Sequence, residues 1–249
     1  MRKNAARKSC SPDPTALAKH PGSDLDPAHS LFVDVEAGDL AIADVAVPTL
    51  RIDDWPAFRD LVVRIGGPNP SFPQTCCYSE SHYRSVGGPL PELEAYETIF
   101  VDSLTELSRL AFRWAEFQPE CVSDRTGQKD TRAAFGLLAR EMIASLQHLQ
   151  HTRNKNIVFV AVLEKILDEF HRSSWEIQTE GSKTGRELPA IVDQIVTMNF
   201  IDFGDGKLVR AFVCTQPNPW DFPAKDRSGK LDQVEEPHLG KLISKLTAK

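Results

Sequence analysis

The stretch Thr98-Ile-Phe-Val-Asp102-Ser103 decides the fold class of this sequence. Its apolar run has the length of one strand, and from Leu104 to about residue 117 apolar side chains recur at helical spacing. Continuous apolar character is typical of a parallel strand that helices cover on both faces. An acid at the carboxyl end of such a strand faces the crevice where α/β sheets bind ligands. The alternative is that Asp102 only caps the helix that follows it.

The rest of the chain alternates between strand and helix patterns. A short apolar run over residues 31–36 ends in acids, and patterns typical of strands recur at residues 50–53 and 157–163. Helical spacing is present at about residues 55–65 and 131–153. The alternation predicts an α/β fold with a mostly parallel central sheet flanked by helices. Patterns in residues 191–214 predict a final set of antiparallel strands, and residues 235–246 a closing helix.

Three segments lack these patterns, and they set the expected domain organisation. Residues 1–29 have no sustained period and are expected to be poorly ordered, whereas residues 30–249 form one domain. Residues 66–91 are rich in glycine and proline and predict an irregular insertion. Residues 168–190 are polar and predict a mobile loop.

Composition excludes several classes of protein. Lys and Arg total 29 against 35 Asp and Glu, a net charge of −6, so nucleic-acid contact would be confined to a local groove. The five cysteines include no C-x-x-C pair, which favours reduced thiols over a zinc or redox site. The longest apolar run, residues 157–163, is far shorter than the ~20 residues that span a bilayer. We expect a cytoplasmic protein with no membrane contact.

Two acids are candidates for chemistry. Asp102 could hold a magnesium ion beside nucleotide phosphates, as in a Walker B strand. Glu36 leaves a second strand, in Leu31-Phe-Val-Asp34-Val-Glu36, and could act as general base on the water that attacks a γ-phosphate. For any single acid in this second run, a solvated loop position is the alternative.

Together these residues resemble RecA-like ATPases, in which a strand of form Phe-Ile-Asp-x-Glu carries the catalytic glutamate and one of form Ile-Val-Val-Asp-Ser carries the Walker B aspartate. Residues 192–206, 210–215 and 223–237 resemble the tail of the phage nucleotide-binding ATPases. The resemblance implies a RecA-like three-layer sandwich that binds ATP and Mg²⁺ in the cytoplasm of a bacterial host. It implies Glu36 as the catalytic acid and Asp102 and Ser103 at the nucleotide, with Asp102 holding the metal.

The tail contains Lys225-Asp-Arg227. In RecA-like ring or filament ATPases such a pair reaches across a subunit boundary to the neighbour's γ-phosphate. The resemblance therefore implies that Lys225 and Arg227 act in trans and that the protein forms a homo-oligomeric ring or filament. The alternative is a solvated turn.

The phosphate loop departs from the family pattern Gly-x-x-x-x-Gly-Lys-Thr. By resemblance Thr15 occupies the place of the magnesium-binding threonine, but Pro14 stands where the lysine belongs, and no glycine precedes Gly22. Proline lacks an amide donor, so Pro12 and Pro14 cannot cradle phosphates. Two explanations remain: the start of the chain is altered, or the protein keeps the fold without competent ATP binding.

Residues 168–190 are the candidate DNA-binding segment. Arg172, Lys183 and Arg186 offer phosphate contacts, and Trp175 offers a stacking surface for single-stranded DNA. The alternative is a solvated loop with a half-buried tryptophan. The leading hypothesis is a phage or prophage ATPase of DNA recombination or replication, with a single-strand annealing protein as a possible partner. The alternative function is a non-catalytic RecA-like module that binds DNA or a partner protein.

Overall fold

A four-stranded parallel sheet forms the centre of the molecule. The computed structural model describes residues 26–38, 42, 44–123, 125–167, 170–171, 173–204 and 206–248. The strand order is β2-β1-β3-β4, and every pair in this sheet is parallel. The four strands are β1 (Ser30–Asp34), β2 (Thr49–Arg51), β3 (Thr98–Asp102) and β4 (Asn156–Phe159). The prediction of a mostly parallel central sheet is confirmed.

The register of the two central strands brings their acidic ends together. Ser30 pairs with Thr98 at one end of β1 and β3, and Asp34 pairs with Asp102 at the other. Every residue of both strands is buried, which accounts for their continuous apolar sequence. Asp34 and Asp102 therefore leave the sheet at the same edge.

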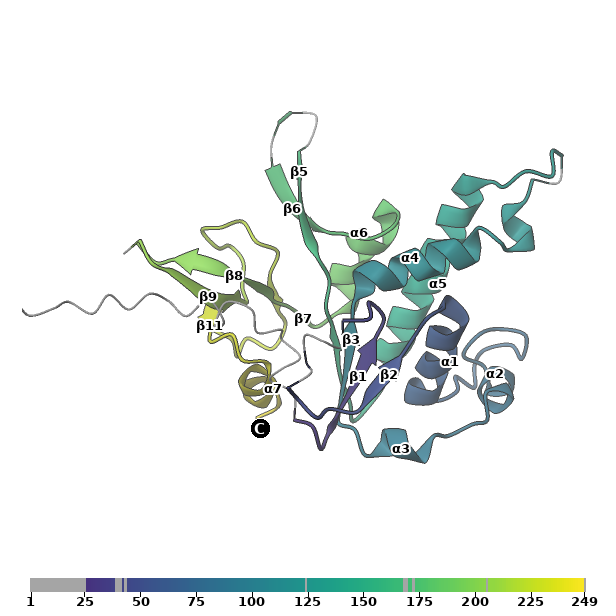
Figure 1. Ribbon diagram of the computed structural model, residues 1–249, viewed down its shortest axis with the longest axis horizontal. Helices are drawn as coiled ribbons and strands as arrows, with labels where there is room; N and C mark the ends of the chain where they lie inside the picture. Colours follow the sequence, from purple (N-terminus) through teal and green to yellow (C-terminus); the bar gives the residue numbers. More distant parts are fainter. Residues whose placement is uncertain are drawn as a thin grey trace, which may run out of the picture.

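Four helices cover one face of the sheet (Figure 1). They are α1 (Trp55–Gly66), α4 (Leu104–Ala115), α5 (Thr131–Gln150) and α6 (Ser182–Ile191), with a short 3₁₀ turn at Pro119–Cys121 between α4 and α5. Asp54, Ser103 and Asp130 cap α1, α4 and α5 by accepting a hydrogen bond from a first-turn amide. The apolar sides of these helices and of β1 and β3 form the main hydrophobic core.

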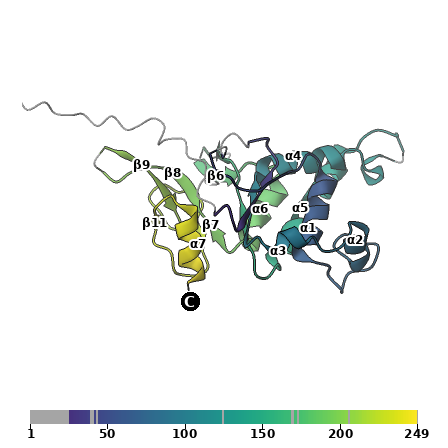
Figure 2. The same ribbon diagram turned by 60° about the horizontal axis from the view of Figure 1, so that its bottom comes forward.

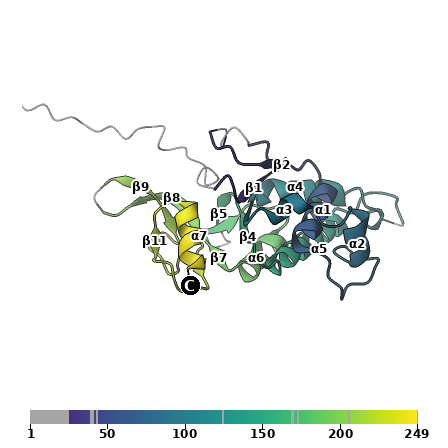
Figure 3. The same cartoon turned by 90° about the horizontal axis from the view of Figure 1, so that it is seen from below.

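The opposite face of the sheet packs against the C-terminal part of the chain. Phe32 of β1 and Phe100 of β3 stack with ring centroids 5.5 Å apart and meet Phe212, Leu239 and Leu242. These last residues belong to a second layer made of β8 (Thr197–Asp202), β9 (Leu208–Val213), β11 (Val234–Glu235) and α7 (Leu239–Thr247). Figures 2 and 3 show this layer on the side of the sheet away from α1 and α5. The fold is a three-layer α/β sandwich that ends in antiparallel strands, as predicted.

The closing helix is shorter than the sequence pattern indicated. Residues 234–235 pair with β9 instead of starting the helix, and α7 begins at Leu239, after Pro237. His238 caps it through its side chain. None of the helices in the described part of the chain has the length and hydropathy needed to cross a membrane.

The prediction of an irregular loop over residues 168–190 is wrong for most of that segment. Residues 173–177 form β6 (Ser173–Ile177), which pairs with β5 (Leu163–Leu167) in an antiparallel hairpin, and residues 182–190 belong to α6. The predicted strand over residues 157–163 is accordingly divided between β4, which ends at Phe159, and β5. The missed signal was the spacing of Thr184, Leu188 and Ile191, which are the buried positions of α6.

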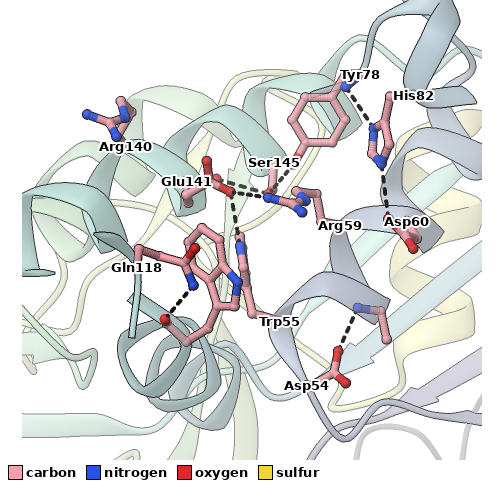
Figure 4. Close-up of polar contacts among 12 residues, drawn as sticks. Asp54, Trp55, Arg59, Asp60, Tyr78, His82, Gln118, Arg140, Glu141 and Ser145 are labelled. Atoms are coloured by element: carbon pink, nitrogen blue, oxygen red, sulfur yellow. Dashed lines mark hydrogen bonds and ion pairs between the residues drawn. The ribbon is translucent and has the colours of Figure 1, made fainter. Parts of the chain in front are cut away.

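The insertion at residues 66–91 is partly helical. It contains α2 (Glu80–Ser85) and leads into the single turn α3 (Pro91–Glu94). Buried and partly buried polar contacts dock it on α1 and α5 (Figure 4). The hydroxyl groups of Tyr78 and Ser145 are 2.6 Å apart, and the amide of Tyr78 donates to Nδ1 of His82, whose Nε2 bonds Asp60. The insertion is therefore held in place by side chains of both helices.

His148 of α5 makes this docking sensitive to pH. Its ring stacks on Tyr78 at 4.5 Å, and its Nε2 donates to the carbonyl oxygen of Gly67. Burial lowers the pKa of His148 below the usual 6.5. A histidine with a lowered pKa in the folded state binds its proton more readily when unfolded, so its contribution to stability is present above pH 6.5 and is lost as the pH falls below that value.

We therefore expect acidification to destabilise the wild-type protein more than a His148→Gln variant. The measurement is the midpoint of urea unfolding at a series of pH values on both sides of 6.5. His151→Gln is the matched control, because His151 is the exposed histidine at the end of the same helix. Parallel pH profiles for the wild type and His148→Gln would contradict the assignment.

Candidate functional site

The candidate site is the acidic edge, defined here as Asp34, Glu36, Asp102 and Ser103 at the carboxyl ends of β1 and β3. Asp34 is 2 % exposed and Asp102 is 5 % exposed. Parallel register requires these two aspartates to lie side by side at the end of the sheet. Carboxylates are rarely buried to this degree unless they bind a charge or a set of donors.

A tight turn after β1 places Glu36 over the end of β3. The amide of Val35 donates to the carbonyl oxygen of Asp102 at 2.8 Å, and the amide of Gly38 donates to Oδ1 of Asp34 at 2.9 Å. Within this turn, Ala37 has φ 58°, which lies in the left-handed region. The Asp34 side chain thus closes the turn and fixes where Glu36 leaves it.

Ser103 connects the two strands through its side chain. Its hydroxyl donates a short hydrogen bond to Oε1 of Glu36 and accepts one from the amide of Glu106 at 3.3 Å. The same hydroxyl therefore caps α4 and orients Glu36. The structure brings Glu36, Asp102 and Ser103 together, and they are the three predicted site residues that share this edge.

The residues of the acidic edge fit a magnesium ion and the phosphates beside it. Mg²⁺ prefers oxygen ligands, usually one or two carboxylates completed by water and phosphate oxygens. Within the described residues no group of three or more His, Cys, Asp or Glu side chains is arranged to hold a metal ion alone. A site with few protein ligands is the kind in which nucleotide phosphates complete the coordination. Gly38 adjoins this edge, since a side chain there would begin 3.8 Å from Oδ2 of Asp102.

A polar pocket of about 220 Å³ adjoins the first turns of α4. Thr105 and Arg109 line it from α4, and Glu164, Gln178, Thr179 and Glu180 line it from the β5–β6 hairpin and the loop that follows. The hydroxyl of Thr105 accepts a hydrogen bond from the amide of Val162 at 3.1 Å and donates one to the carbonyl oxygen of Gln178 at 2.9 Å. The base of the hairpin is therefore bonded to the helix that starts at Ser103.

The comparisons with known proteins identify the family of the chain. A family model described as an AAA domain matches residues 16–228. The chain belongs to the AAA domain family. This AAA domain is thus a P-loop NTPase-like protein, a group whose members bind nucleotides. Neither a curated protein nor a solved structure matches the chain.

Two predicted site residues of this AAA domain, Thr15 and Arg172, lie outside the described residues. Two others, Lys225 and Arg227, contact groups around the end of α6. Lys225 in β10 (Lys225–Asp226) donates to the carbonyl oxygens of Pro189 and Val192, the latter at 2.7 Å. Arg227 forms a salt bridge with Asp193 at 2.7 Å. β10 pairs with β7 (Gln194–Ile195), so both cations flank the end of α6.

Trp175, Lys183 and Arg186, the predicted DNA-binding residues that the structure describes, lie on β6 and α6. Trp175 in β6 packs against Phe222 with ring centroids 5.4 Å apart, and Nζ of Lys165 lies 5.8 Å from its ring. Its faces are therefore partly occupied within the chain. Lys183 and Arg186 are exposed on α6, so they remain accessible to phosphate.

Sequence reasoning gave no separate role to Asp34, Thr105 or Arg109. The acids of residues 34–39 were considered together, as candidates to polarise the attacking water or as solvated loop positions, and the turn that the Asp34 side chain closes was not predicted. Arg109 lies close enough to Glu36 for the two charges to interact, and its hydrogen bond to Glu106 raises the pKa of Arg109. No sequence signal indicates the contact of Thr105 with the hairpin, because its partners are distant in the sequence. Val162 lies 57 positions after Thr105, and Gln178 lies 73 positions after it.

Proposed function

We propose that this AAA domain is a RecA-like ATPase whose acidic edge binds Mg²⁺-ATP. The observation that carries the proposal is the meeting of Glu36, Asp102 and Ser103 at one edge of the parallel sheet, where α/β proteins bind nucleotides. Magnesium would neutralise charge on the transferred phosphoryl group. Asp102 would hold the metal, with Thr15 as a second ligand.

Glu36 is proposed to orient and deprotonate the attacking water. A general base must have a carboxylate within hydrogen-bond reach of that water. The Asp34 carboxylate holds the turn, and Ser103 holds Oε1, so Oε2 of Glu36 is the oxygen that would face the water. Ser103 in this scheme positions Glu36 in addition to lying beside the nucleotide.

Lys225 and Arg227 are proposed to complete the site of a neighbouring subunit. Within their own chain both side chains contact the end of α6, and the sequence resemblance supports a role in trans, in a homo-oligomeric ring or filament. A phage or prophage role in DNA recombination or replication, with a single-strand annealing protein as partner, rests on the sequence resemblance. The cytoplasm of a bacterial host is the proposed location.

Calorimetric titration with Mg²⁺-ATP tests the proposal. We expect ATP binding that requires magnesium and is lost in Asp102→Asn, whereas Asp60→Asn, which alters a carboxylate on the insertion side of α1, retains it. Absence of ATP binding by the wild-type chain would reject the ATPase proposal.

Absence of ATP binding would favour a non-catalytic module that binds DNA or a partner protein. The specific observation in its favour is the replacement of the expected phosphate loop by a segment with Pro12 and Pro14 and no glycine before Gly22. A chain that binds single-stranded DNA but not ATP would establish this function instead.

Binding to single-stranded DNA should weaken as salt rises, because counterions are released from the phosphates. Replacing Lys183 and Arg186 by glutamine together should reduce the slope of log K against log salt by about 1.4, or ~0.7 per phosphate contact. The measurement is fluorescence anisotropy with a labelled oligonucleotide. Lys241→Gln on α7 is the control, and an unchanged slope in the double variant would remove these two residues from the DNA contact.

A further inference from the structure

Helix α6 begins without a side-chain cap, directly after a strand. β6 ends at Ile177, a short loop follows, and α6 starts at Ser182 with Gly181 as its N-terminal cap residue (Figure 1). Gly181 has φ 69° and carries no side chain that could accept a first-turn amide. The first three amides of an α-helix have no partner within the helix. Hydrogen bonds from the amides of Ser182, Lys183 and Thr184 are likewise absent among the described residues.

A second, independent feature is the side chain of Thr184. It is 2 % exposed, and its hydroxyl has no hydrogen-bond partner in the described part of the chain. Side chains of an α-helix lean towards its N-terminus, so the Thr184 hydroxyl leans towards the open first turn. A buried hydroxyl without a partner is unfavourable. A bound anion would supply the acceptor that this hydroxyl lacks among the described residues.

The surrounding charges favour an anion at this position. Lys183 and Arg186 are exposed, and Nζ of Lys183 makes a long contact, 3.9 Å, with Glu187. Lys183, Glu187 and Arg140, which is paired with Glu120, line a groove of about 480 Å³ between α5 and α6. Glu180 precedes the helix, but it lines the pocket that contains Arg109.

We infer that the N-terminus of α6 is a phosphate-binding site, formed by the amides of Ser182, Lys183 and Thr184 and by the side chains of Lys183 and Thr184. Phosphate loops bind their anion at a helix N-terminus that follows a strand, with the help of a glycine, a lysine and a threonine. Here the sequence Gly181-Ser-Lys-Thr184 supplies them outside the acidic edge. The phosphate belongs either to a nucleic-acid backbone or to a nucleotide. The inference rests on the proposed DNA binding only if the phosphate belongs to a nucleic-acid backbone.

The test is an NMR titration of the full ¹⁵N-labelled chain with inorganic phosphate. We expect saturable shifts of the amide signals of Ser182, Lys183 and Thr184. Parallel titrations with ATP and with an oligothymidylate identify the source: the ligand that shifts these amides at the lowest concentration carries the phosphate. Absence of a shift at these three amides with all three probes would overturn the inference. Because inorganic phosphate tests the site alone, its outcome is separate from that of the ATP and DNA experiments above.

Two variants separate binding from folding. Ser182→Asp places a carboxylate at the first turn, where it favours the helix and competes with phosphate. We expect loss of the phosphate response without a lower melting temperature, whereas Ser71→Asp, in the exposed insertion, retains the response. Thr184→Val keeps the shape of the side chain and removes the hydroxyl, and should weaken phosphate binding about two- to fivefold, the size expected for one donor at a helix N-terminus. A phosphate response unchanged in both Ser182→Asp and Thr184→Val would also overturn the inference.

Discussion

Replacing Glu36 by glutamine is expected to lower the rate of magnesium-dependent ATP hydrolysis about 10²- to 10⁴-fold, the contribution of a positioned general base. ATP binding should persist, because glutamine keeps the length of the side chain and can still accept the hydrogen bond from Ser103. The change removes the basic oxygen and leaves the turn after β1 intact, since Asp34 and Gly38 hold that turn independently.

The measurement is single-turnover hydrolysis at saturating ATP, with binding measured separately by calorimetry. Glu92→Gln on α3 is the matched control, because Glu92 is an exposed glutamate outside the site. If Glu36→Gln turned over ATP at the wild-type rate, the catalytic base would have to be another residue. A loss of both binding and hydrolysis would show that Glu36 acts on the metal or the nucleotide rather than on water.

The sheet and the acidic edge were predictable because their causes are local. A strand buried on both faces needs a continuous apolar run, and β1 and β3 both have one that ends in an acid. Parallel neighbours must end at the same edge, so the proximity of Asp34 and Asp102 follows from the strand pattern alone. The sequence pattern left Asp102 as the candidate cap of the following helix, whereas the residue that caps α4 is Ser103.

The β5–β6 hairpin was not predictable by the same means. It projects from the sheet and buries little of either strand, and in β6 the alternation is confined to two half-buried positions, Trp175 and Ile177. Its base is held by Thr105, on a helix more than 50 residues earlier. The packing of Trp175 on Phe222 is similarly a long-range contact, and it makes the ring less available for base stacking than its polar surroundings indicated.

Mixing two inactive variants is expected to restore activity if Lys225 and Arg227 act in trans. Arg227→Ala alone should lower ATP hydrolysis about 10³- to 10⁵-fold, as loss of an arginine finger does. Glu36→Gln alone is inactive for a different reason. In a ring or filament each site lies between two subunits, so an equal mixture gives about a quarter of the sites both an intact Glu36 and an intact neighbouring Arg227.

The control is a mixture of Glu36→Gln with Asp102→Ala, two changes at the same acidic edge. No mixed site can be complete there, because both residues come from one chain, and activity should stay absent. Native mass spectrometry establishes that mixed oligomers have formed. If mixed oligomers of Arg227→Ala and Glu36→Gln formed without recovery of hydrolysis, Arg227 would act only through its salt bridge to Asp193, as a residue that holds β10 beside the end of α6.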